Sequence, residues 1–151
     1  MIKKYNEEGV TLLELLATIT LAGIIIVLIS NFFSQANEYN ERETIKNQLQ
    51  QESNLILNTI QQWHTKYNIT EISNVTSNTE SYVKIVARDK KGKPYIETFN
   101  KQNINYNIIS GKFNLNEGED SPTKIIFEME LTSGKINYKS KTTFSKLSGN
   151  N

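Results

Sequence analysis

The sequence predicts an α+β fold in which a long N-terminal α-helix forms a spine that packs on a small antiparallel β-sheet head. Fifteen of the 20 residues from 10 to 29 are apolar, and no glycine interrupts the chain between Gly23 and Gly92. Both prolines, Pro94 and Pro122, lie in the second half of the chain. There, short β-branched and aromatic runs alternate with turn residues, as in antiparallel sheets. A helix is therefore expected first and a sheet after it.

The composition limits the classes of function. With 151 residues and a formal net charge of +1, one modest core is expected beside a membrane segment, which argues against a multidomain enzyme. The chain has no cysteine, which excludes a disulfide framework, a thiol nucleophile and a zinc–thiolate site. No overall charge attracts the chain to nucleic acid or anionic lipid, so such a partner would need a local patch.

Residues 10–29 are expected to span a membrane. As a helix that rises about 1.5 Å per residue, they cross the roughly 30 Å hydrocarbon layer. The apolar run continues to Phe33 instead of ending at a small-x-small cleavage site, which argues against a secretory signal peptide. Lys3 and Lys4 favour a cytoplasmic N-terminus by the positive-inside rule. The rest of the chain would then lie outside.

Glu14 is the charged residue within this apolar run. Insertion scales assign an acidic side chain a cost on the order of 3 kcal/mol at the centre of a membrane helix, and less near one end. Two interpretations of the residues alone are open. Either the carboxylate reaches the interface from the first helical turns, or it receives a cation from another molecule.

The segment Gly9-Val-Thr-Leu-Leu-Glu14 follows a short polar leader with lysines and precedes an unbroken apolar helix. It closely resembles the class III signal of type IV pilins and pseudopilins. The typical form of that signal is glycine, phenylalanine, threonine, leucine, isoleucine, glutamate, and the resemblance covers residues 1–33. Two positions differ from the family pattern. Val10 replaces the usual aromatic residue, and Asn31 stands where many major pilins have proline.

The resemblance implies that residues 1–9 are a leader, and that a prepilin peptidase cuts between Gly9 and Val10 and methylates the new amine of Val10. It implies that residues 10–33 serve first as a transmembrane helix and then as filament core. Glu14 would pair there with the N-terminal amine of a neighbouring subunit. The implied partners are the prepilin peptidase, other pilin or pseudopilin subunits, membrane lipid and the inner-membrane assembly platform. The resemblance implies a structural role, with no enzymatic activity and no cofactor expected.

Residues 34–67 are expected to continue the helix as an amphipathic segment. Its apolar residues follow one another at steps of four, seven, four, three and four, which places on one helical face Ile45, Leu49, Ile56, Ile60, Trp63 and Tyr67. We expect this stripe to pack against the sheet. His64 is the only histidine, and without a second histidine or a cysteine nearby it is expected to be exposed on the helix.

Residues 68–151 are expected to form the β-rich head. The polar stretch from Asn68 to Ser81 is interpreted as a loop. Alternation in 83–87, a turn at 89–94 and a second run at 95–99 predict a hairpin, after which 104–108 alternates and a short 113–115 segment follows.

A last hairpin is predicted to join 124–132 to 135–144 through a two-residue turn at Ser133 and Gly134. In this register the expected cross-strand pairs are Leu131 with Ile136, Met129 with Tyr138, and Glu128 with Lys139.

Two charged segments of the head are considered for ligands. Arg88, Lys90, Lys91 and Lys93 form a basic turn that could contact DNA phosphates, with a solvated hairpin tip as the alternative. The acidic loop 114–120 could offer oxygen ligands to calcium, but it lacks the spacing of an EF-hand, so no metal site is predicted. No set of acid, base and nucleophile is recognised.

The sequence is therefore interpreted as a minor pilin or pseudopilin of a type IV pilus, a competence pseudopilus or a type II secretion pseudopilus. The absence of cysteine and the short head favour the first two systems. Before assembly the chain is expected to be a single-pass cell-membrane protein with its head outside, and afterwards part of an extracellular or cell-envelope filament. The alternative is a single-pass anchored surface protein that never assembles and whose head binds a ligand or DNA. Nucleic acid is not expected to be bound by the filament subunit alone.

Overall fold

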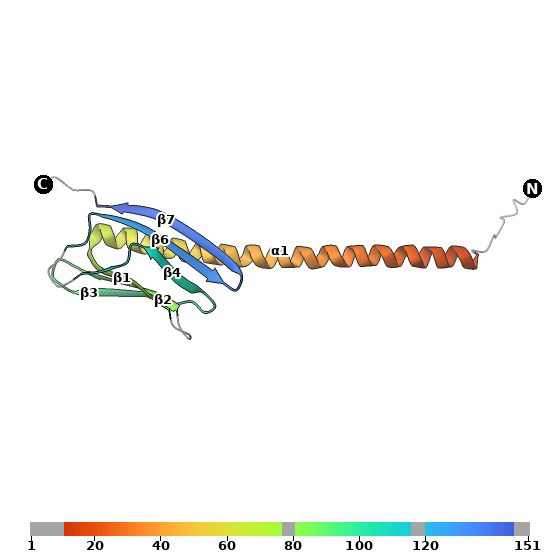
Figure 1. Cartoon of the computed structure of the whole chain (residues 1–151), viewed down its shortest axis with the longest axis horizontal. Coiled ribbons are helices and arrows are strands. Elements are labelled where there is room, and N and C mark those ends of the chain that lie inside the picture. The colour runs from red at the N-terminus through yellow and green to blue at the C-terminus, as the bar shows by residue number, and fades with distance from the viewer. Residues whose placement is uncertain (1–10, 77–80, 116–119, 147–151) are drawn as a thin grey trace, which may run out of the picture. The chain divides into compact units, whose positions relative to one another are not determined.

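The computed structural model describes residues 11–76, 81–115 and 120–146. The predicted α+β class is confirmed (Figure 1). The elements in chain order are α1 (Leu12–Lys66), β1 (Asn68–Thr76), β2 (Ser81–Arg88), β3 (Pro94–Phe99), β4 (Asn105–Ser110), β5 (Phe113–Asn114), β6 (Lys124–Ser133) and β7 (Ile136–Ser145). The chain divides into two compact units, residues 1–41 and residues 42–151.

The second half of α1 supplies one wall of the core. The predicted stripe is confirmed, because Leu49, Ile56 and Ile60 are fully buried and the other three members of the stripe pack against the same core. Two polar residues of the same face, Ser53 and His64, are buried as well. The helix ends where Tyr67 N donates a hydrogen bond to Trp63 O at 2.7 Å and the chain turns directly into β1.

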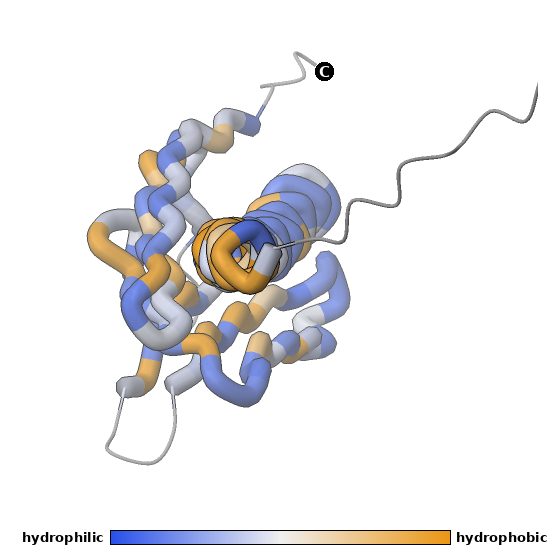
Figure 2. The backbone as a smooth tube through the Cα atoms, turned by 90° about the vertical axis from the view of Figure 1, so that its right-hand side faces the viewer, coloured by the Kyte–Doolittle hydropathy of each residue, from blue (hydrophilic) through white to orange (hydrophobic). Residues whose placement is uncertain are grey.

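The head contains two small antiparallel sheets, where one was predicted. The first has the strand order β3-β2-β1-β5 and the second the order β4-β6-β7. Seen along α1, the sheets flank the helix on adjacent sides, and hydrophobic and hydrophilic residues alternate along their strands (Figure 2). The buried side chains of both sheets and of α1 form a single cluster. A chain with only 37% apolar residues therefore builds one shared core.

The predicted loop from Asn68 to Ser81 is wrong, because most of this segment is strand β1. The strand pairs with β2 on one side and with β5 on the other. Its register shifts between Ile69 and Glu71, so Thr70 is the extra residue of a β-bulge. The bulge turns Ile69 and Ile72 to the same buried face although they lie three positions apart. This spacing hides the period of two that identifies a strand.

The two predicted hairpins are present, the second in a different register. β2 and β3 pair as expected around the turn at Asp89. β6 and β7 pair Leu131 with Tyr138 and Glu130 with Lys139, two residues from the predicted register. The turn is Gly134-Lys135, because Gly134, with φ +58°, takes the first central position, which in a type II′ turn favours glycine. A shift of two residues leaves each side chain on its predicted face.

Tyr106 of β4 joins the two sheets and the helix. Ser81 Oγ on β2 accepts a hydrogen bond from Tyr106 N at 2.8 Å. The Tyr106 hydroxyl donates to Glu52 Oε1 on α1 at 2.9 Å and accepts from Lys101 N at 3.1 Å. Burial and the adjacent Glu52 carboxylate raise the pKa of Tyr106 above its ordinary value. The hydroxyl therefore stays protonated and continues to donate this bond at physiological pH.

Gly111 lies between β4 and β5, where the chain passes close to β6. Its φ is +90°, in the region that favours glycine. A Cβ atom at this position would lie 2.9 Å from Ile126 O and 2.9 Å from Phe127 Cδ2. Any side chain here would displace strand β6 or its buried phenylalanine.

An ion pair on the first sheet links β1 to β2. Ser73 Oγ donates to Glu71 Oε1 at 2.6 Å, and Lys84 Nζ donates to Glu71 Oε2 at 3.0 Å. Burial acts to raise the pKa of Glu71, but the hydrogen bonds from Ser73 and Lys84 and the charge of Lys84 outweigh it and hold this pKa below its ordinary value.

This ion pair predicts a dependence of stability on pH. Because the folded pKa of Glu71 is lowered, its carboxylate stabilises the head above the unfolded pKa of about 4.3, and the contribution is lost as the pH falls through the folded pKa. Lys84→Met should lower the free energy of unfolding by up to about 1 kcal/mol at neutral pH, because the pair is partly exposed. The difference from wild type, measured by denaturant unfolding, should shrink at about pH 3. Lys124→Met is the matched control, and a difference independent of pH would contradict the prediction.

Candidate functional site

The first turn of α1 brings Glu14 into contact with Thr11. Thr11 N and Thr11 Oγ1 both donate to Glu14 Oε2 at 2.9 Å, and Glu14 N donates to Thr11 Oγ1 at 3.3 Å. This reciprocal pattern is a capping box, which satisfies two of the backbone donors that a helix start leaves unpaired. In the isolated chain the Glu14 carboxylate therefore holds the start of its own helix. Gly9 and Val10, the predicted cleavage and methylation site, lie outside the described residues.

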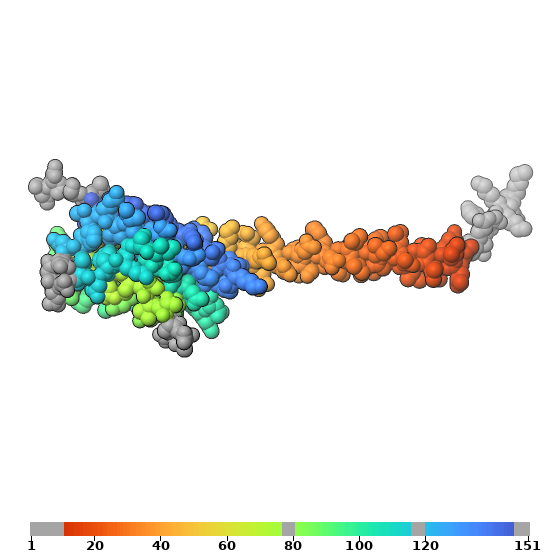
Figure 3. Space-filling model, viewed as in Figure 1, coloured from red at the N-terminus to blue at the C-terminus, as the bar shows by residue number. Residues whose placement is uncertain are grey.

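The first part of α1 presents a continuous apolar surface. Its large apolar side chains are exposed from Leu12 to Phe33, and Figure 3 shows this part of the helix in red and orange. By length and composition, this is the one helix among the described residues suited to a single membrane span or a signal anchor. Gly23 has open space around it and marks no contact within the chain.

The basic turn is organised by an acidic residue. Asp89 Oδ1 accepts hydrogen bonds from Lys91 N at 2.8 Å and Lys93 N at 2.9 Å, and Gly92, with φ +80°, closes the turn. Arg88 is the last residue of β2 and Lys90 is exposed in the turn. The four predicted cations therefore belong to one tight turn, with the Asp89 carboxylate at its centre.

Tyr95 is adjacent to this turn in the sequence, and the fold brings two further aromatic rings, Tyr67 and Trp63, near it. Tyr67 stacks on Tyr95 with ring centroids 4.7 Å apart at 24°, and Trp63 lies edge-on to Tyr67 at 6.2 Å. Lys93 Nζ lies 5.7 Å from the centre of the Tyr95 ring. Tyr67 lies between α1 and β1, and Tyr95 is the second residue of β3, so their proximity depends on the pairing of β1 with β2 and of β2 with β3.

A shallow hollow adjoins the basic turn at the end of α1. Its lining includes four cations, Lys66, Arg88, Lys90 and Lys146, and two carboxylates, Asp89 and Asp120. Opposite charges therefore partly compensate one another, and the hollow has a modest positive balance. Of the acidic loop considered for calcium, residues 116–119 lie outside the described residues. The remaining described residues contain no group of three acidic, histidine or cysteine side chains suited to a metal.

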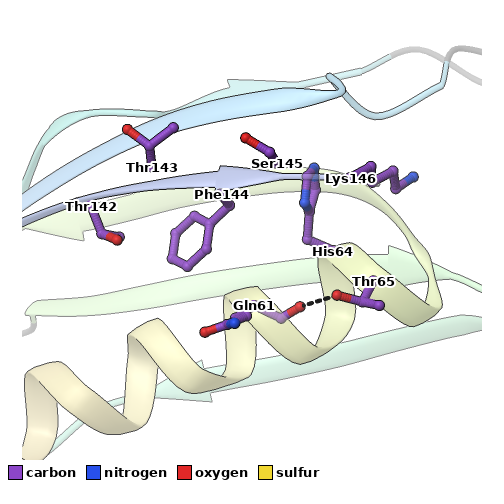
Figure 4. Close-up of a pocket in the computed structure, with 8 residues that line it drawn as sticks. All are labelled: Gln61, His64, Thr65, Thr142, Thr143, Phe144, Ser145 and Lys146. Atoms are coloured by element: carbon purple, nitrogen blue, oxygen red, sulfur yellow. Dashed lines mark hydrogen bonds between the residues drawn. The ribbon is translucent and has the colours of Figure 1, made fainter. Parts of the chain in front are cut away.

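His64 is buried, contrary to the prediction of an exposed histidine. It is 2% exposed, and its Nε2 lies 2.8 Å from Pro122 O. Because a carbonyl oxygen only accepts, Nε2 must hold the proton of this hydrogen bond. The groove beside it is lined by hydroxyl side chains from the end of β7 and by Lys146, and His64 points from α1 toward that strand (Figure 4). This hydrogen bond from His64 links the segment at Pro122 to the helix.

The capping box has a local signal in the sequence. A threonine followed three residues later by glutamate, before an apolar run, is the pattern of this helix start.

Comparison of the chain with protein-family models, with curated proteins and with solved structures finds no match. The architecture, a long apolar N-terminal helix followed by a small antiparallel head, is compatible with that of pilins.

Proposed function

We propose that the chain is a structural subunit, a minor pilin or pseudopilin, of a type IV pilus-like filament. The supporting observation is the exposed apolar surface of α1 from Leu12 to Phe33, with one carboxylate, Glu14, in its first turn. A surface of this size and kind needs lipid or other apolar helices around it. It would be a membrane anchor before assembly, with the head outside, and filament core afterwards.

In this proposal Glu14 serves as a registry residue. A prepilin peptidase cleaves after Gly9 and methylates Val10, and the resulting ammonium of one subunit meets the Glu14 carboxylate of a neighbour. Two opposite charges about 4 Å apart attract by roughly 1 kcal/mol in water and roughly 4 kcal/mol at an effective dielectric constant of about 20. A filament core therefore favours the one helix register that joins the two charges. The capping box would exchange its Thr11 donors for this ammonium.

The mature N-terminus tests the proposal. Mass spectrometry of the chain from its native cells is expected to find N-methyl-valine at residue 10. Gly9→Leu should abolish this product, whereas Gly23→Leu, which changes a helical glycine with open space around it, should be processed normally. An intact Met1, or cleavage after Ala22, would contradict the proposal.

A second candidate is an anchored surface protein whose head binds nucleic acid. The observation that favours it is the basic turn beside the stacked Tyr67 and Tyr95 rings, because cations contact phosphates and aromatic rings stack on bases. The compensating carboxylates Asp89 and Asp120 weigh against it. This candidate does not need a filament.

Charge removal distinguishes the second candidate. If the head binds DNA, replacing Arg88, Lys90, Lys91 and Lys93 by alanine should weaken DNA retention by at least about tenfold, since each lost phosphate contact reduces binding. The matched control removes four cations elsewhere, Lys124, Lys135, Lys139 and Lys141. Equal losses in both variants, or no measurable retention by the wild-type chain, would contradict DNA binding at the turn.

A further inference from the structure

Between Lys46 and Lys66, the outward side of α1 contains no charged residue. Between Lys46 and Lys66, ten residues are exposed, and they comprise eight amides, one threonine and one leucine: Asn47, Gln48, Gln50, Gln51, Asn54, Leu55, Asn58, Gln61, Gln62 and Thr65. Their spacing places them on one side of the helix, and we call them the amide face. The carboxylate of this stretch, Glu52, accepts the hydrogen bond from the Tyr106 hydroxyl instead.

The chemistry of the amide face matches a second copy of itself. Each amide side chain both donates and accepts hydrogen bonds, so two such faces can pair with one another. No charge has to leave water when they meet, and no like charges oppose one another. An acidic or a basic partner would find no opposite charge on this face between Lys46 and Lys66.

The amide face also carries one projecting apolar side chain and one hollow. Leu55 is its apolar residue and is 54% exposed. Farther along the helix, a hollow is lined by Asn58, Gln61, Gln62, Thr65 and Lys66. The spacing of the first four residues, i, i+3, i+4 and i+7, is that of the hole that receives one side chain when two helices pack.

We propose that Leu55 of one copy inserts into this hole on a second, parallel copy. The inference rests on the proposed function, because a filament aligns parallel copies side by side. The hole is centred six to seven residues beyond Leu55, so the copies are staggered by about 10 Å along the helix axis. The contact joins two different patches, and such a contact repeats without closing, which generates an open helical assembly. Of the two proposed roles, this contact favours a pseudopilin that occupies successive positions along the filament over a minor pilin.

Engineered disulfides test this contact directly, because the chain contains no cysteine. Positions 55 and 62 are about 10.5 Å apart along one helix, beyond the roughly 7 Å between Cα atoms that a disulfide tolerates. A bond between Leu55→Cys and Gln62→Cys must therefore join two copies. In native cells treated with a mild oxidant, the double variant should give a ladder of dimers, trimers and larger products. Each single variant should remain monomeric.

The other outcomes separate the contact from the proposed function. Dimers from Leu55→Cys alone would show a symmetric contact and overturn the stagger. A product with a different protein would overturn the second copy as the occupant. Absence of the ladder in sheared filaments that contain the double variant would overturn the contact and leave the filament role standing. Absence of the wild-type chain from filaments would overturn both.

A charge substitution provides a second measurement. Leu55→Lys places an ammonium in a hole that Lys66 also lines, and should reduce incorporation into filaments by at least about tenfold, with an unchanged amount in the membrane. Ile126→Lys is the matched control, since Ile126 on β6 is 50% exposed and lies outside the amide face. Its incorporation should stay within about twofold of wild type. Equal losses in the two variants would overturn the inference.

Discussion

Glu14→Gln is expected to reduce incorporation of the chain into filaments by at least about tenfold, because a charge pair worth several kcal/mol in a filament core is lost. Membrane insertion should be unchanged or improved, since the neutral amide is cheaper to insert than a carboxylate. The measurement compares the chain in sheared filaments with the chain in membranes of the same cells. Glutamine is the informative substitution because it also accepts hydrogen bonds at this position of a capping box.

Thr11→Ala is the matched control for Glu14→Gln. It removes the Thr11 hydroxyl that bonds Glu14 Oε2 and Glu14 N but keeps the carboxylate. Loss of an N-cap residue costs about 1 kcal/mol of helix stability, so incorporation should fall far less than in Glu14→Gln. If Glu14→Gln assembles normally and Thr11→Ala does not, Glu14 acts as a cap and the registry role is wrong.

Phe127→Ala is expected to lower the free energy of unfolding of the head by about 3–5 kcal/mol, because it leaves a cavity in the core. Phe127 is fully buried on β6, the central strand of its sheet, and its ring centroid lies 6.4 Å from that of Phe144. Domains of this size are stable by only about 5–15 kcal/mol. This one substitution should therefore remove a large share of the stability.

The adjacent residue on the opposite face of β6 is the control for Phe127→Ala. Ile126 is half exposed, so Ile126→Ala should change the free energy of unfolding by less than about 1 kcal/mol. Urea unfolding of the detergent-solubilised chain, followed by the fluorescence of Trp63, the only tryptophan, reports on the head. Similar midpoints for the two variants would contradict the burial of Phe127.

The helix was predictable because its signals are local. The apolar run, the stripe that begins at Ile45 and the absence of glycine after Gly23 are all signals along one continuous stretch of the chain. β1 was missed because a bulge at Thr70 shifts the spacing of Ile69 and Ile72 from two to three. The register of the last hairpin was missed because it depends on which residues occupy the two turn positions.

The parts of the site that sequence analysis could not find depend on contacts between distant residues. His64 is buried by a carbonyl from Pro122, 58 positions away, and no local pattern identifies such a partner. Tyr67 and Tyr95 stack because β1, which follows Tyr67, also pairs with β2, and the predicted hairpin of β2 and β3 does not establish that pairing. The capping box, by contrast, is a local motif between Thr11 and Glu14 and was present in the sequence to be recognised.

The close approach at Gly111 has an evolutionary consequence. Its φ is +90°, and there is no room for a Cβ atom beside Ile126 O and Phe127, so we expect glycine alone to be tolerated at this position. Surface residues of the head can change without affecting this contact, whereas replacing the glycine would bring a Cβ atom against the backbone oxygen of Ile126, whichever side chain stands at position 127. Divergent relatives are therefore expected to show an invariant glycine between two short strands, about 16 positions before a buried aromatic residue.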